Sequence, residues 1–327
     1  MQRLLEETGI TEATSARVGL TTRHELVFAR PRGQSHHQQA EAAQTALVTH
    51  LSKLALGSKA ARENGTLAPD PGSVRNSTRS PNLAHVLSPN VLVRKLQNIS
   101  DLTQSDIAIL EGIPLSKREC RANEDIVREG ERPTHSFVVL EGLVGSTKLT
   151  GDGKRQITSF FVPGDIPDLH GMHLSVLDCT FSSLARASLG FMRHDAMRAI
   201  CDRHASIAAI FWRSTLIDAA IYREWVTNVG RRDAYTRMAH ILCELIVRLH
   251  SMGVIKDHVA NLPITQAALA DALGLSTVHV NRVLQELRRN GLIFTEGTRF
   301  HAVDWAGLVR AGDFDATYLH QRTAITF

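Results

Sequence analysis

The densest group of side chains able to do specific chemistry lies between residues 265 and 289. If the apolar residues of a helix that begins after position 276 turn inward, the side chains left outside are Ser276, Thr277, Val278, Asn281, Arg282 and Gln285. An arginine can read guanine O6 and N7 through two hydrogen bonds, and an asparagine or glutamine can read adenine. A valine offers only apolar contact, for instance to a thymine methyl group. Arg288 and Arg289 lie further along and suit phosphate groups.

Such a surface requires two helices that meet at a tight turn. A helix-turn-helix needs a small residue where its helices cross, a glycine in the turn and an apolar residue that locks the second helix on the first. Ala270, Gly274 and Val280 lie at those offsets. Ser276 is expected to be the N-cap of the second helix, because its hydroxyl can accept a hydrogen bond from a backbone N–H one turn on. The second helix is then expected to enter the major groove by its N-terminal half.

The next residues favour a winged form of this motif. Residues 290–303 contain two short apolar runs, and Gly297 fits the hairpin turn between them. The alternative, an ordinary helical hairpin with solvated polar residues, does not account for these two predicted strands.

Further upstream, residues 126–192 have a sequence pattern typical of a β-sandwich or jelly roll. Apolar and β-branched runs over 136–140, 143–149, 156–162 and 183–191 are separated by glycine-containing turns. Two short helices, beginning near 91 and 102, are expected before them.

Between these two regions, residues 206–228 predict one long helix that Gly230 would end. Its apolar stripe consists of Ile207, Ile210, Phe211, Ile217, Ile221 and Trp225. The stripe fits either a packed core helix or a two-fold seam between two chains. Its position before a DNA-binding motif favours the seam.

This order of elements resembles the Crp/Fnr family of regulators, as do Pro163-Gly-Asp165, the helix over 231–244 and the stretch 273–282. The resemblance covers about residues 91–304 and implies an α+β fold. The domains it implies are a β-roll (jelly-roll, cyclic-nucleotide-binding-like) sensor domain over 91–205, a dimerisation helix over 206–229 and a winged helix-turn-helix over 230–304. A polar, disordered extension over 1–90 and a tail over 305–327 lie outside it. The resemblance further implies a homodimer on a two-fold symmetric operator, contact with RNA polymerase and a guanine-reading role for Arg282.

The chain departs from the family at both of its well-known sensing sites. Cyclic-nucleotide binders of the family use a Gly-Glu-Leu turn and an arginine that neutralises the cyclic phosphate. The matching stretches here are 168–171 and 181–183, with Phe181 in the place of the cation. The candidate effector-binding residues are Asp168, His170, Phe181 and Ser182. The iron–sulfur branch needs clustered N-terminal cysteines and residues 1–119 contain none, so neither cyclic AMP nor an iron–sulfur cluster is expected to control the protein. In this sequence Val278 occupies the position of the glutamate that the family often uses to read a base.

Other kinds of chemistry find little support. His170 and His173 could ligate a metal or haem with Asp168 and Cys179, but sixteen histidines make such proximity common by chance, and no metal is predicted. No nucleophile is paired with a base in a catalytic motif, so no enzyme is expected.

The composition agrees with a DNA-binding protein without requiring one. The formal charge is +4 and the isoelectric point is near 9.0. The basic excess lies in residues 231–300, where nine Lys and Arg face six Asp and Glu. No run of about 18 apolar residues exists and the N-terminus does not have the order of a signal peptide, so a cytoplasmic protein is expected. The remaining alternative is a ligand-binding or protein-interaction module without DNA-binding activity.

Overall fold

The computed structural model describes residues 90–255 and 259–322. The chain divides into two compact units, Met1–Asn82 and Leu83–Phe327, and all described residues belong to the second unit. Apart from Asn90, the extension expected over 1–90 lies outside the described residues, as does the end of the tail.

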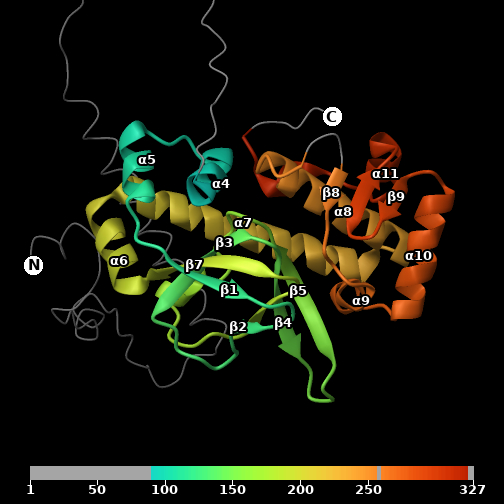
Figure 1. The fold of residues 1–327 in the computed structure, drawn as a ribbon, viewed down its shortest axis with the longest axis horizontal. Helices are drawn as coiled ribbons and strands as arrows, with labels where there is room; N and C mark the ends of the chain where they lie inside the picture. Colours follow the sequence, from blue (N-terminus) through green and yellow to red (C-terminus); the bar gives the residue numbers. More distant parts are fainter. Residues whose placement is uncertain (1–89, 256–258, 323–327) are drawn as a thin grey trace, which may run out of the picture. The chain divides into compact units, whose positions relative to one another are not determined.

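The region predicted to be a sensor domain is a β-roll of two antiparallel sheets (Figure 1), which confirms the predicted fold class. One sheet has the order β1-β7-β3 and the other the order β2-β6-β4-β5. The strands are β1 (Ser116–Cys120), β2 (Asp125–Val127), β3 (His135–Glu141), β4 (Val144–Leu149), β5 (Arg155–Phe161), β6 (Thr180–Ser183) and β7 (Ala187–Arg193). Phe137, Phe161 and Phe181 fill the space between the sheets with edge-on ring contacts.

Two details of the predicted β region were wrong. The run over 183–191 is not one strand, because the chain leaves the four-stranded sheet after β6 and enters the three-stranded sheet at β7. Strand β1 was missed because four of its five side chains are exposed and polar, so it lacks apolar alternation and forms by pairing with β7.

Two capped helices precede the β-roll, as expected. The Asn90 side chain accepts hydrogen bonds from the backbone of Leu92 and Val93 at the start of α4 (Val91–Ile99). Thr103 and Asp106 form a capping box at the start of α5 (Gln104–Glu111). The short 3-10 helix η1 (Leu169–Met172) lies between β5 and β6, and α6 (His194–Arg203) follows β7.

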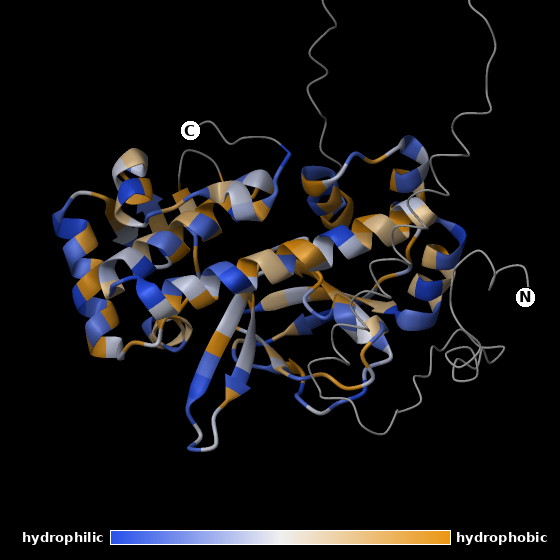
Figure 2. Cartoon of the chain, turned by 180° about the vertical axis from the view of Figure 1, so that it is seen from behind, coloured by the Kyte–Doolittle hydropathy of each residue, from blue (hydrophilic) through white to orange (hydrophobic). Residues whose placement is uncertain are grey.

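The long helix α7 (Ala205–Arg231) corrects two expectations. The stripe predicted as an intermolecular seam is buried inside this chain and belongs to its main core cluster. Gly230 does not end the helix, which continues to Arg231 and stops where Arg232 becomes extended and Asp233 caps the next helix. Figure 2 shows the apolar segments of α7, which runs in front of the sheets in that view.

The C-terminal region is a winged helix-turn-helix, as predicted. Its elements are α8 (Ala234–Ser251), β8 (Val259–Asn261), α9 (Gln266–Leu273), α10 (Thr277–Arg289), β9 (Ile293–Glu296), β10 (Arg299–Ala302), α11 (Trp305–Ala311) and the 3-10 helix η2 (Ala316–Leu319). The wing has three strands in the order β8-β10-β9, one more than expected. Gly297 has a φ of 59° in the β9–β10 turn, as the predicted hairpin requires. None of the helices in the described ranges has the length and apolarity needed to cross a membrane.

Candidate nucleic-acid interface

The corner between α9 and α10 is built from short-range signals. The Thr265 side chain caps α9 by accepting a hydrogen bond from the backbone of Ala268. Gly274 ends α9 in the left-handed conformation, with a φ of 64° that other residues rarely adopt. The Ser276 hydroxyl accepts a hydrogen bond from the His279 backbone at 3.2 Å, which confirms Ser276 as the N-cap of α10.

The buried face of α10 consists of Val280, Val283, Leu284 and Leu287. Because these side chains fix the rotation of the helix, its polar side chains face outward. An open surface hollow is lined by Gln266, Thr277, Val278, Asn281, Arg282 and Gln285. Val278 is 79% exposed in spite of its apolar side chain. The structure thus brings together five of the predicted base-reading residues.

Gln266 was not predicted, because the base-reading residues were predicted from the outward positions of the second helix and Gln266 lies on the first. It is the first residue of α9, directly after the cap at Thr265. The Asn281 Nδ2 donates a hydrogen bond to the Gln266 Oε1 at 3.3 Å. The first helix therefore contributes a side chain to the same hollow.

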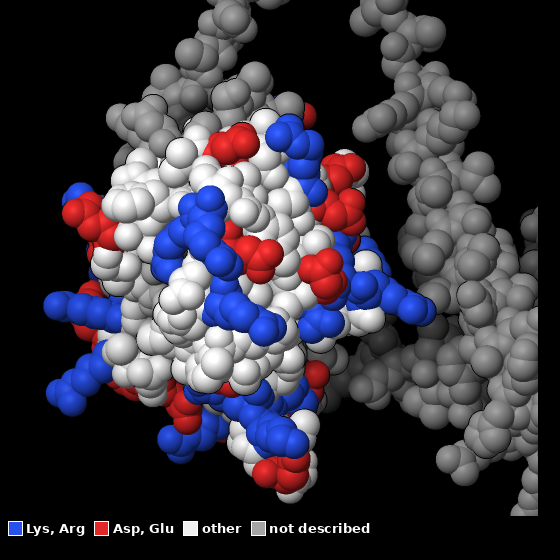
Figure 3. All heavy atoms as spheres, turned by 90° about the vertical axis from the view of Figure 1, so that its right-hand side faces the viewer, with Lys and Arg blue, Asp and Glu red and all other residues white. Residues whose placement is uncertain are grey.

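The two arginines at the end of α10 differ in their contacts. The Arg288 Nε donates a hydrogen bond to the Thr295 hydroxyl at 3.0 Å, so this side chain also ties the helix to the wing strand β9. Arg289 is exposed. Figure 3 shows lysine and arginine side chains spread over the face that carries α10, with uncharged surface and some carboxylates between them.

An ion pair reduces the negative charge on α9. The Arg155 Nη2 on β5 lies 2.7 Å from the Asp271 Oδ2 on α9. Next to it, the Gln156 Nε2 donates a hydrogen bond to the Ala272 carbonyl at 3.1 Å. The first helix of the motif therefore contacts strand β5 of the four-stranded sheet.

A buried chain of charges connects α4, the β-roll and α8. The Lys95 Nζ lies 2.7 Å from the Asp165 Oδ1, and the Arg248 Nη2 lies 2.6 Å from the Asp165 Oδ2. The other arm of the guanidinium donates to the Glu244 Oε1 at 2.8 Å. Burial alone raises the pKa of Asp165, but Lys95 and Arg248 outweigh it and hold the pKa below its ordinary value. Asp165 belongs to the Pro-Gly-Asp motif noted in the sequence, which thus anchors α8.

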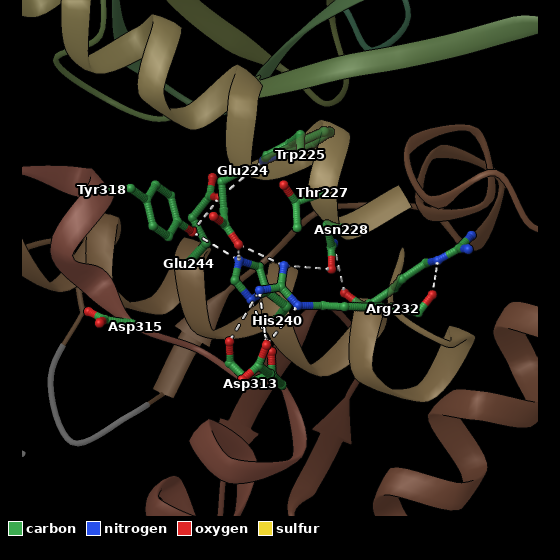
Figure 4. Close-up of polar contacts among 12 residues, drawn as sticks. Glu224, Trp225, Thr227, Asn228, Arg232, His240, Glu244, Asp313, Asp315 and Tyr318 are labelled. Atoms are coloured by element: carbon green, nitrogen blue, oxygen red, sulfur yellow. Dashed lines mark hydrogen bonds and ion pairs between the residues drawn. The ribbon is translucent and has the colours of Figure 1, made fainter. Parts of the chain in front are cut away.

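The network of buried charges also reaches α7 and the C-terminal segment (Figure 4). The Glu244 Oε2 accepts hydrogen bonds from the Trp225 Nε1 at 3.0 Å and the Tyr318 hydroxyl at 2.8 Å. Nearby, Arg232 forms ion pairs with Glu224 and Asp313 at 2.7 and 3.2 Å. Residues beyond the predicted wing therefore pack on the junction between α7 and α8.

The candidate effector residues divide into two groups. Asp168 is buried, its Oδ1 accepts a hydrogen bond from the Phe137 backbone, and burial raises its pKa to about 8. The His170 ring lies 6.2 Å from the Phe181 ring, and burial lowers the pKa of His170. Ser182 lies on the opposite face of β6, where its hydroxyl donates to the Asp125 Oδ1 at 2.8 Å. The structure thus brings Asp168, His170 and Phe181 together but not Ser182.

This corner contains two buried polar atoms with no partner. Among the described residues, neither the Asp168 Oδ2 nor the His170 Nε2 has a hydrogen-bond partner. Over the same residues, no group of three or more His, Cys, Asp or Glu side chains could hold a metal ion.

Comparisons with known proteins match both halves of this architecture. A cyclic nucleotide-binding domain model matches residues 117–204, and a Crp-like helix-turn-helix domain model matches residues 236–311. The nitrogen fixation regulation protein FixK of Bradyrhizobium diazoefficiens is 30% identical over 178 residues, which is 53% of this chain and 71% of that protein. The transcriptional activator protein FnrA of Stutzerimonas stutzeri is 26% identical over 225 residues, 67% of this chain and 88% of that protein. The solved structure of FixK2 from Bradyrhizobium japonicum has the same fold, with a TM-score of 0.55 and 24% identity over 60% of this chain and 96% of that one.

Proposed function

Because the chain belongs to the Crp/Fnr family of DNA-binding transcription regulators, we propose that it acts as a homodimer on a two-fold symmetric operator. The observation that carries the proposal is the hollow over α10, where Arg282, Asn281 and Val278 project from a helix fixed by its cap and its buried face. Two copies would place their α10 helices in successive major grooves, roughly 34 Å apart.

The exposed side of α7 supports the homodimer. Its large apolar side chains are Trp212, Leu216 and Val226, which are 67%, 50% and 74% exposed. Together with Ala209, Ala219 and Arg223 they recur at steps of three and four residues, the spacing of a two-stranded coiled coil. This second stripe replaces the buried one as the proposed seam between protomers.

We also propose that neither cyclic AMP nor an iron–sulfur cluster controls the protein. Phe181 is fully buried and packs on Phe137 and Phe161, at the position where the family's cyclic-nucleotide binders carry the arginine that neutralises the cyclic phosphate. We propose the corner of Asp168 and His170 as the effector site, because the Asp168 Oδ2 and the His170 Nε2 have no hydrogen-bond partner among the described residues. We assign the protein to the cytoplasm, expect contact with RNA polymerase at its operators and propose no catalytic activity.

The test is selection of operator sequences from a random DNA pool by the full-length protein, followed by mobility shifts. We expect a two-fold symmetric site that retains one dimer. An intact dimer that retards no DNA even at low salt would support the alternative, a ligand-binding or protein-interaction module. Selection by an Arg282→Ala variant should yield a site that has lost its preference for guanine at one position in each half.

A further inference from the structure

We propose that Gln266 determines specificity by positioning Asn281 to read an adenine in each half-site. The inference deepens the proposed function and rests on it. It starts from the hydrogen bond between the Asn281 Nδ2 and the Gln266 Oε1, 3.3 Å long, which joins the two helices of the motif across the hollow.

The chemistry of the asparagine amide explains how this bond acts. An amide nitrogen carries two hydrogens and the amide oxygen only accepts. We assign to Gln266 the hydrogen of the Asn281 Nδ2 that points away from the Oδ1, so that the second hydrogen and the Oδ1 remain together on the other edge of the amide. That edge matches adenine, whose N7 accepts and whose N6 amino group donates. Guanine presents two acceptors, N7 and O6, and does not match it.

Gln266 suits this role because it is exposed at the first position of α9. Its replacement does not disturb the core, and the caps of α9 and α10 come from Thr265 and Ser276. The hydrogen bond is also partly solvated, so its contribution to folding is small. The effect of losing Gln266 is therefore expected in base preference and not in stability.

The experiment compares two substitutions of Gln266 on the selected operator. Gln266→Met keeps the length of the side chain but removes the acceptor, so Asn281 becomes free to rotate. Gln266→Glu keeps an acceptor for the Asn281 Nδ2. We expect the methionine variant to lose about tenfold of the preference for adenine over guanine at one position, and the glutamate variant to retain that preference with weaker binding to all DNA.

Modified bases and a double-mutant cycle identify the mechanism. Replacement of the adenine by 7-deazaadenine removes N7 and should weaken the wild-type protein about tenfold, but leave Asn281→Ala unaffected. Asn281→Ala and Gln266→Met should each weaken binding to the selected operator by a similar factor. The double variant should bind no more weakly than Asn281→Ala alone. Thermal unfolding of all variants serves as the folding control.

Two results would overturn the inference. In one, Gln266→Met weakens binding equally on all sequences, and its effect on the binding free energy adds to that of Asn281→Ala. Loss of a direct contact from Gln266 to a phosphate would have this result. In the other, Gln266→Met leaves the base preference unchanged. Both differ from a failure of the proposed function, in which the wild-type protein selects no operator at all.

Discussion

Arg282 and Arg289 are both exposed on α10, seven residues apart, and we propose that they contact different parts of a duplex. We expect Arg282→Ala to cost about 1–3 kcal/mol on the selected operator and to relax the preference at one base pair. Arg289→Ala should weaken all DNA alike and flatten the salt dependence, because it removes a phosphate contact. Binding isotherms at several salt concentrations measure both. A loss confined to one sequence for Arg289→Ala contradicts the assignment.

We propose that Val278 recognises a base by apolar contact, without a hydrogen bond. The family's base-reading glutamate is absent here, and a branched apolar side chain, 79% exposed, lies in the hollow instead. We expect a thymine opposite Val278, recognised by its methyl group. Replacing that thymine by deoxyuridine should weaken the wild-type protein severalfold and leave Val278→Ala unchanged. Equal sensitivity of both proteins to the missing methyl group would show that another side chain makes this contact.

Asp168 is expected to make stability depend on pH. Its pKa is raised to about 8 by burial, from an ordinary value of 3.8, so between these values the folded protein holds a proton that the unfolded chain has released. Stability must therefore fall as pH rises through this window, by at most about 1.4 kcal/mol per pH unit. Asp168→Asn keeps the acceptor for the Phe137 backbone and cannot titrate.

The stability advantage of Asp168→Asn over the wild type should thus grow from about pH 5 to about pH 8, as measured by denaturant unfolding. Asp195→Asn is the control, because hydrogen bonds from Arg193 and the Ala196 backbone lower the pKa of Asp195 to about 2 and no alkaline gain is expected. A constant difference between Asp168→Asn and the wild type across this range would show that Asp168 stays ionised.

At the level of elements, the α9–α10 corner could be predicted because each of its parts has a local signature. Ser276 caps α10, Gly274 supplies the left-handed turn and Val280 lies on the buried face, all within one short segment. The side on which α7 packs could not be predicted, because both of its faces carry large apolar residues. The tie between α9 and β5 also escaped prediction, since Arg155 and Asp271 are far apart in the sequence.

The α9–α10 turn makes a prediction about stability. Gly274→Ala should destabilise the protein by about 1–2 kcal/mol, because the left-handed conformation is costly for any residue with a Cβ. Space is not the cause, since an added Cβ would meet no atom nearer than the Val229 Cγ1 at 3.7 Å. Gly151→Ala is the matched control: it has open space and no positive φ, and should be neutral. Chemical unfolding of both variants distinguishes strain from crowding.

The exposed stripe of α7 predicts the assembly state. Trp212→Glu should dissociate the dimer and abolish operator binding while each chain remains folded, because the substitution puts a charge in the proposed seam. Leu149→Glu on the β4–β5 hairpin removes an apolar side chain of similar exposure, 66% against 67%, and should leave the dimer intact. Light scattering and circular dichroism give the mass and the fold. A monomeric wild-type protein, or a dimeric Trp212→Glu, would place the seam elsewhere.

For the molecule as a whole, buried ion pairs join the β-roll to the helix α8 that leads into the helix-turn-helix. Asp165 could be recognised from the sequence as part of a motif, but its partner Arg248 lies 83 residues further along and only the fold brings the two together. Beyond the predicted wing, the backbone N–H of Arg322 donates to the Asn98 carbonyl at 2.8 Å, so the C-terminal segment also returns to α4. The segment expected to be a simple tail is part of the packed structure over its described length.

Arg248 on α8 forms the buried ion pair with Asp165 of the β-roll, and its loss can be tested directly. Arg248→Met fills much of the same volume but leaves the Asp165 and Glu244 carboxylates buried with one cation fewer. We expect it to lower the free energy of unfolding by about 3–5 kcal/mol at neutral pH. The control is Arg155→Met, which breaks the more exposed pair with Asp271 and should lower the free energy of unfolding by at most about 1 kcal/mol.

Because the wild-type pairs hold the pKa of Asp165 below 3.8, their stabilising effect is present above that pH and is lost as the pH falls through the lowered value. The difference in the free energy of unfolding between the wild type and Arg248→Met, measured with urea, should consequently become smaller in acid. A difference that is small at neutral pH and does not change with pH would mean that apolar packing alone holds α8 on the β-roll.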